Sequence, residues 1–108
     1  MRVRWLLPAL AAAASVVAAP ALASTDAAWA QMRAEAIGAC LAAGRTALEN
    51  KGRLSAVVSP FGTEAHALVR VTQVVGKRSN VYVCVMDKAS RRAFFDPAPL
   101  ATWRQPGS

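Results

Sequence analysis

The sequence has only one histidine, two cysteines and six acidic residues among its 108 residues, and these low counts exclude most kinds of reactive site. One histidine cannot build a metal site that needs several imidazoles. The two cysteines, Cys40 and Cys84, form neither a C-x-x-C nor a C-x-x-C-H pattern, so no zinc, thioredoxin-like or haem signature is present. No glycine-rich loop follows an apolar strand, which excludes a phosphate-binding loop. We therefore expect neither a cofactor nor a metal.

The N-terminus has the pattern of a cleavable secretory signal peptide. Arg2 and Arg4 precede an apolar run over residues 5–19, and the run closes on Ala21-Leu22-Ala23 before Ser24. Small residues at this A-x-A spacing are what signal peptidase accepts. The alternative is an uncleaved membrane anchor, but the run is shorter than the roughly 20 residues that span a bilayer. The sequence predicts a signal peptide over residues 1–23 and a periplasmic or secreted protein, with an Ala-rich composition typical of bacteria.

Residues 24–108 would then be the mature chain, which is long enough for one small domain. Loss of Arg2 and Arg4 lowers the formal net charge from +7 to +5. The core of so small a domain gives only marginal stability without additional support. In an oxidising compartment an even pair of cysteines favours a structural disulfide, so we expect Cys40 and Cys84 to be bonded. A pair of free buried thiols and a functional redox or metal pair are the alternatives.

A single helix is predicted at the start of the mature chain. Ser24, Thr25 and Asp26 are typical of a helix N-terminus, and no proline interrupts the Ala-rich segment that continues to Asn50. At 100° per residue the apolar stripe of this helix is centred near Cys40. Gly52 can adopt the positive φ that ends a helix.

After Gly52 the pattern changes to short β-strands separated by short connections, which favours an antiparallel meander. The fold class is therefore α+β, with one helix on a three- to four-stranded antiparallel sheet, an order similar to that of cystatin-like folds. No family motif accompanies this order, and topology alone implies no function. The domain covers residues 24–96, and the proline-containing tail, 97–108, is expected to be irregular. The expected strands are Leu54–Ser59, Ala65–Val75, Val81–Met86 and Arg92–Phe95, with a turn over residues 76–80.

Both faces of the third expected strand are apolar. If Cys84 bonds to Cys40, then Tyr82 and Met86 face the helix, because side chains alternate along a strand. Its other face needs a cover, which is either the C-terminal tail or another chain. With Phe94, this face is the candidate interaction surface, and a homodimer or an envelope protein is the candidate partner. Its valines are Val81, Val83 and Val85.

Basic residues occupy the turns at the two ends of this strand, so they are not expected to form one compact patch. Solvated turn charges are the simplest interpretation, and an anionic surface polymer or lipid head groups are the alternative partners. The pattern does not favour nucleic acid, because aromatic residues are not interleaved with the basic ones. The candidates are Lys77 and Arg78 at one end, and Lys88, Arg91 and Arg92 at the other.

Few residues could carry chemistry. His66 shares an expected strand face with Glu64 and Arg70, and a Glu–His pair can do acid–base work. Asp87 and Asp96 lie at the ends of the last hairpin, where carboxylates are ordinary turn residues. The sequence therefore predicts a small exported binding protein without catalytic activity. The alternatives are a small enzyme or thiol-redox accessory that uses His66, Glu64 or the cysteines, and a structural envelope protein.

Overall fold

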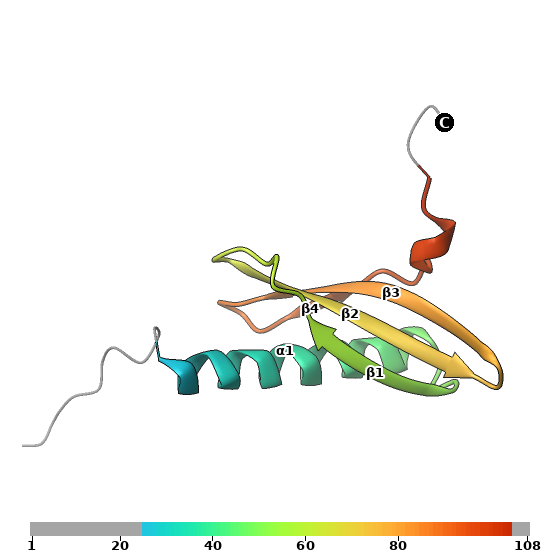
Figure 1. The fold of residues 1–108 in the computed structure, drawn as a ribbon, viewed down its shortest axis with the longest axis horizontal. Coiled ribbons are helices and arrows are strands. Elements are labelled where there is room, and N and C mark those ends of the chain that lie inside the picture. The colour runs from blue at the N-terminus through green and yellow to red at the C-terminus, as the bar shows by residue number, and fades with distance from the viewer. Residues whose placement is uncertain (1–24, 105–108) are drawn as a thin grey trace, which may run out of the picture.

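The computed structural model describes residues 25–104, and the predicted signal peptide, residues 1–23, lies outside them. The chain forms one helix followed by a four-stranded antiparallel sheet in the order β1-β2-β3-β4. The helix lies along one face of the sheet, and the C-terminal segment lies on the other side (Figure 1). The expected α+β meander is therefore confirmed. The elements are α1 Asp26–Ala47, β1 Arg53–Val58, β2 His66–Val75, β3 Arg78–Asp87, β4 Ala93–Phe95 and the 3-10 turn η4 Leu100–Thr102.

Helix α1 begins as the sequence predicts and ends earlier. The Oγ1 atom of Thr25 accepts a hydrogen bond from the Ala28 N–H at 3.0 Å, which is a side-chain N-cap. The expected continuation to Asn50 is wrong, because the chain leaves the helix at Leu48. Glu49 has φ 58°, and the Asn50 N–H donates to the Arg45 carbonyl at 2.8 Å. This is a Schellman closure without glycine at its left-handed position.

The strands form one continuous ladder with the neighbours expected from the meander. Val69 pairs with Val58 of β1 and with Cys84 of β3, and Cys84 pairs with Phe95 of β4. The expected five-residue turn over 76–80 is wrong, because Val75 pairs with Arg78 and leaves only Gly76 and Lys77 between the strands. The polar residues 78–80 extend β3 because pairing depends on backbone groups.

The C-terminal tail is not wholly irregular, which corrects the sequence-based expectation. Leu100–Thr102 form the 3-10 turn η4, and the Thr102 N–H donates to the Pro99 carbonyl at 2.8 Å. The Trp103 indole N–H also donates to the Ala98 carbonyl at 3.2 Å. Short 3-10 turns of this kind are common connectors, and here the turn packs back toward β3.

The core lies between α1 and the sheet and contains the disulfide. Cys40 and Cys84 are bonded, with their Cα atoms 5.9 Å apart, and both are fully buried. The bond joins the middle of α1 to the middle of β3, as the helix stripe and the strand alternation predict. The other fully or almost fully buried apolar residues are Ala36, Ala67, Val69, Val71, Tyr82 and Met86.

One polar side chain is buried at the end of this core. Gln73 is 5% exposed, and its Nε2 donates to the Lys51 carbonyl at 3.0 Å. Its Oε1 accepts from the Tyr82 hydroxyl at 3.1 Å. These bonds satisfy the buried amide and tie β2 and β3 to the connection between α1 and β1. Within residues 25–104, no helix combines the length and hydropathy that a membrane span needs.

Candidate functional site

The sheet face away from α1, hereafter the open face, carries apolar side chains that the fold leaves incompletely covered. Because Cys84 faces the helix, alternation puts Val81, Val83 and Val85 on the open face, where each is half-buried. The segment around η4 covers part of this face. Phe94 is nevertheless 56% exposed and Val57 is 54% exposed.

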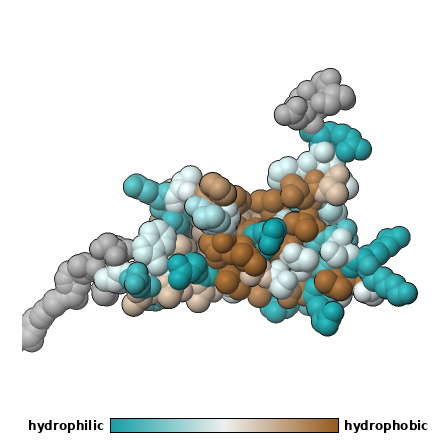
Figure 2. Space-filling model, viewed as in Figure 1, coloured by the Kyte–Doolittle hydropathy of each residue, from teal (hydrophilic) through white to brown (hydrophobic). Residues whose placement is uncertain are grey.

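The open face is hollowed into a shallow groove beside η4. The groove has a volume of about 320 Å³, and its lining includes Val57 of β1, Leu68 of β2 and Val83 of β3. Pro60 of the β1–β2 connection and Leu100 of η4 also line it. Figure 2 shows hydrophobic side chains gathered over the strands, between the β1–β2 connection and the C-terminal segment, with a hydrophilic group among them. The groove can therefore accept an apolar group from solution.

A single charged side chain lines this groove. Arg70 pairs in register with Val57 on one side and with Val83 on the other, so its neighbours across the strands are apolar. It is exposed, and it has no hydrogen bond or ion pair with any residue of the described chain. The sequence pattern indicated Arg70 only as a neighbour of His66. Arg70 lacks a charged partner because β1 and β3 place apolar residues beside it.

The predicted interaction residues do not lie together. Phe94 joins the valines on the open face, where it pairs with Val85. The Arg92 guanidinium lies 5.7 Å from the Phe94 ring centroid, an exposed cation–π contact. Lys77 and Arg78 lie at the tip of the β2–β3 hairpin, away from Arg92. The basic residues therefore do not form one patch, as their positions in the sequence predict.

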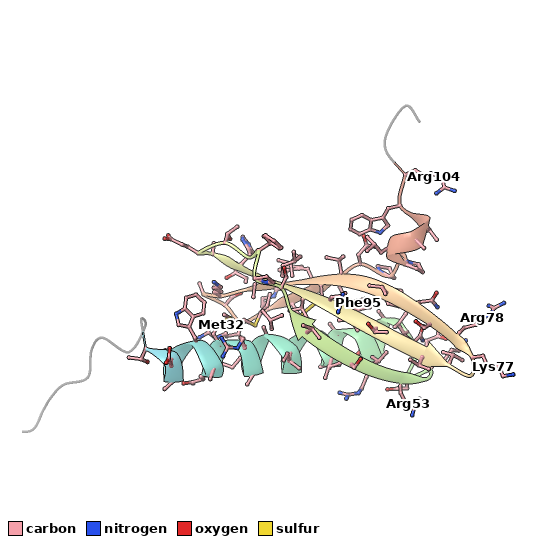
Figure 3. The ribbon with its side chains drawn as sticks, in the orientation of Figure 1. Met32, Arg53, Lys77, Arg78, Phe95 and Arg104 are labelled. Carbon is pink, nitrogen blue, oxygen red and sulfur yellow. A yellow bond between two sulfur atoms is a disulfide. The ribbon has the colours of Figure 1, made fainter. Side chains whose placement is uncertain are left out.

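The hairpin end of the molecule is more basic than the sequence pattern indicates. Arg53 begins β1 and pairs with Val74, close to the turn that carries Lys77 and Arg78. Figure 3 shows these three side chains extending from the same end of the sheet. All three are exposed, so their charges are solvated.

A second hollow lies beside the first turns of α1, with a volume of about 330 Å³. Trp29, Met32 and Glu64 line it together with Lys88. The Lys88 Nζ donates to the Thr63 carbonyl at 2.7 Å and lies 5.3 Å from the Trp29 ring centroid. This lysine therefore has partners within the fold, and it anchors the β1–β2 connection to the β3–β4 turn.

Arg91 also has an internal partner. Its Nε lies 2.8 Å from the Glu35 Oε1, so this ion pair fastens the β3–β4 turn to α1. Both side chains remain partly exposed, and an ion pair in that setting contributes little to stability. Arg91, one of the basic residues predicted to contact a partner, thus packs beside the helix and not on the open face.

The Glu64–His66 pair is not assembled. Glu64 precedes β2 and lines the hollow beside α1, whereas His66 projects from the opposite side of the sheet because Ala67 is buried against the helix. The expectation that both share one strand face is therefore wrong. Both cysteines are fully buried in the disulfide and offer no thiolate for nucleophilic chemistry. Residues 25–104 contain no cluster of three metal-ligating side chains.

The aspartates of the last hairpin act as turn residues. The Asp87 Oδ1 accepts from the Ala89 N–H at 2.8 Å and from the Ser90 N–H at 3.1 Å. Asp96 accepts in the same way from the Ala98 N–H at 2.9 Å. Hydrogen bonds from backbone N–H groups, first Ser90 and then Ala89, lower the pKa of Asp87 below its usual value of 3.8.

The lowered pKa of Asp87 predicts a small acid-dependent loss of stability. A carboxyl whose pKa falls on folding stabilises the native state above its unfolded pKa and loses that effect as the pH falls through its folded pKa. We therefore expect Asp87→Asn to flatten the decrease in stability below pH 3.8 relative to wild type. Urea unfolding at several acidic pH values measures this slope. Identical slopes for both proteins would contradict the assignment, and Glu49→Gln, at an exposed residue away from this turn, is the control.

The chain matches no protein-family model, no curated protein and no solved structure. A proposal about its function is therefore based on the arrangement of its own residues.

Proposed function

We propose that this protein is exported and acts as a non-catalytic binding module that engages its partner through the open face of the sheet. The observation that carries the proposal is the incompletely covered apolar surface around Val83, on a sheet whose other face is buried under α1. Exposed apolar patches of this kind are typical of interaction sites. The Cys40–Cys84 disulfide is compatible with an oxidising compartment, which supports export to the periplasm or beyond.

Export predicts removal of the leader after Ala23. The Ala21-Leu22-Ala23 sequence follows the apolar run at the spacing that signal peptidase accepts. The intact mass of the exported protein should therefore correspond to a chain that starts at Ser24. Ala23→Asp should block cleavage and retain the leader, which provides the matched control. A wild-type exported product that still carries Met1 would refute processing.

Binding through the open face predicts that Val83→Lys removes the partner and leaves the fold intact. Val83 is half-buried and lines the groove, so an ammonium group there would charge the apolar surface that the partner must cover. The mature wild-type and variant chains would be incubated with envelope extract, recovered, and analysed by mass spectrometry for bound protein and lipid. We expect bound material with wild type and at least a tenfold loss with the variant.

Ala42→Lys is the matched control, because Ala42 is an exposed residue of α1, on the other side of the sheet. It adds the same charge and should leave the bound material unchanged. Circular dichroism melting checks that both variants are folded. Bound material that is unaffected by Val83→Lys, in a variant that melts like wild type, would show that the open face is not the binding surface. Strong destabilisation by Val83→Lys would instead indicate that the tail covers this face as part of the core.

A further inference from the structure

The groove of the open face contains one charged side chain without an ion-pair partner, and the rest of its lining is mostly apolar. Arg70 stands between Val57 and Val83, and Leu68 and Leu100 also line the groove. The volume, about 320 Å³, is at the lower end of the range for small-molecule sites. Such a site fits a ligand that has one polar end and one apolar end.

The charge of the polar end follows from Arg70. Its guanidinium carries five N–H donors in a planar fork and remains protonated at any ordinary pH. It has no acceptor among the described residues, and no acidic side chain lines the groove. A phosphate or carboxylate can accept two parallel hydrogen bonds from such a fork. The head group of the ligand is therefore anionic.

An alkyl chain suits the floor of the groove better than an extended peptide does. The floor of the groove is a sheet face on which Leu68, Arg70 and Val83 belong to strands paired with neighbours on both sides. Their backbone N–H and C=O groups are therefore already bonded. A peptide lying on this floor would lose water from its own amide groups without gaining partners, which is costly. An alkyl chain has no such groups.

A second copy of this chain is also a poor occupant. Two copies in contact groove to groove would bring together two copies of Arg70, with no carboxylate in the groove of either copy to pair with them. Like charges buried together without partners are strongly unfavourable. The charge of the groove therefore favours a ligand that supplies the missing anion.

We propose that the groove binds a single-chain anionic amphiphile, whose phosphate or carboxylate is held by Arg70 and whose alkyl chain lies against Val57, Leu68, Val83 and Leu100. The inference rests on the proposed function and names the ligand class of the same face. The bound molecule is a monomer taken from solution, because a groove of about 320 Å³ holds one small molecule.

The test titrates the mature chain, residues 24–108, with decyl phosphate below its micelle concentration and follows binding by calorimetry and by amide chemical shifts. We expect one molecule per chain, with shifts at Leu68, Arg70 and Val83. The uncharged probe 1-decanol should bind roughly tenfold more weakly or worse, because it cannot accept charge-assisted hydrogen bonds as phosphate does. Octyl phosphate should bind up to about 15-fold more weakly, since each fully buried methylene changes the affinity about fourfold.

Substitutions then separate the two ends of the site. Arg70→Gln should weaken binding of decyl phosphate roughly tenfold or more and leave the weaker binding of 1-decanol unchanged. Arg70→Lys, which keeps the charge but not the planar fork, should be intermediate. Arg78→Gln removes the same charge at the hairpin tip (Figure 3) and should have no effect. Leu100→Ala, at a 42% exposed residue, should weaken both probes several-fold. Unchanged melting shows that these variants remain folded.

Four results would overturn the proposal. The first is that wild type and Arg70→Gln bind decyl phosphate with equal affinity, and the second is that wild type binds decyl phosphate and 1-decanol with equal affinity. The third is that the chemical shift changes are confined to the hollow beside Trp29. The fourth is that the protein binds anionic phospholipid vesicles but not the monomeric probe. The last would assign the face to a membrane surface. If no probe binds but Val83→Lys still removes a protein recovered from the extract, the amphiphile is refuted and the proposed function stands. If Val83→Lys removes nothing and no probe binds, both fail.

Discussion

Replacing Cys40 and Cys84 together with alanine is expected to lower the free energy of unfolding by about 2–5 kcal/mol. The bond closes a loop whose ends are separated by 44 positions in the sequence. In the chain-entropy account, a loop of this length restricts the unfolded state by about 4 kcal/mol. Small domains have total stabilities of about 5–15 kcal/mol, so the variant should lose a large fraction of its stability.

The position of the bond adds to its effect. Both sulfur atoms are fully buried, and the bond is the only covalent link between α1 and β3 apart from the main chain. Urea unfolding of wild type and of the double alanine variant measures the loss. Wild type in the presence of a reductant is the matched control and should approach the variant. Two thiols that react freely with a labelling reagent in the native, oxidised protein would contradict the bond itself.

Gly52→Ala is expected to destabilise the protein by about 2–5 kcal/mol. Gly52 has φ +70°, a conformation that disfavours any residue with a Cβ. A Cβ at this position would lie 2.4 Å from the Val74 carbonyl oxygen and 2.7 Å from the Val75 Cγ2. The left-handed backbone costs about 1–2 kcal/mol, and the contact with the backbone of β2 adds about 1–3 kcal/mol of overpacking.

Gly76→Ala separates these two contributions. Gly76 also has positive φ, +59°, but a Cβ there would meet nothing within 4 Å. This variant should therefore show only the conformational cost of about 1–2 kcal/mol. Chemical denaturation of both variants checks the difference. Equal losses for Gly52→Ala and Gly76→Ala would show that the approach of the α1–β1 connection to β2 is not tight in solution.

Local patterns in the sequence were sufficient to predict the helix, the strands and the pairing of the cysteines. A helix stripe centred on Cys40 and strand alternation around Cys84 both arise from the periodicity of the backbone within one element. The same alternation placed Tyr82 and Met86 toward α1 and the three valines of β3 on the open face. These predictions needed no information about distant segments.

Element ends depended on contacts that the sequence pattern does not show. Pairing with β2 extended β3 back to Arg78, through polar residues that resemble a turn. A Schellman closure at Glu49 ended α1 before Asn50. Packing against β3 accompanied the formation of η4 in a proline-containing tail. In each case hydrogen bonds between backbone groups outweighed side-chain propensity.

The residues of the candidate site were likewise predicted from the sequence only in part. The sequence indicated Val83 and Phe94 as surface residues, because the apolar run of β3 is visible without a structure. It did not indicate the groove, since Val57, Arg70 and Leu100 come from three separate segments whose proximity is set by strand register and by the return of the tail. Composition and periodicity determined the compartment hypothesis, the fold class and the apolar face. Tertiary structure alone decided that an unpaired arginine stands within that face, because pairing between strands places neighbours that are remote in sequence.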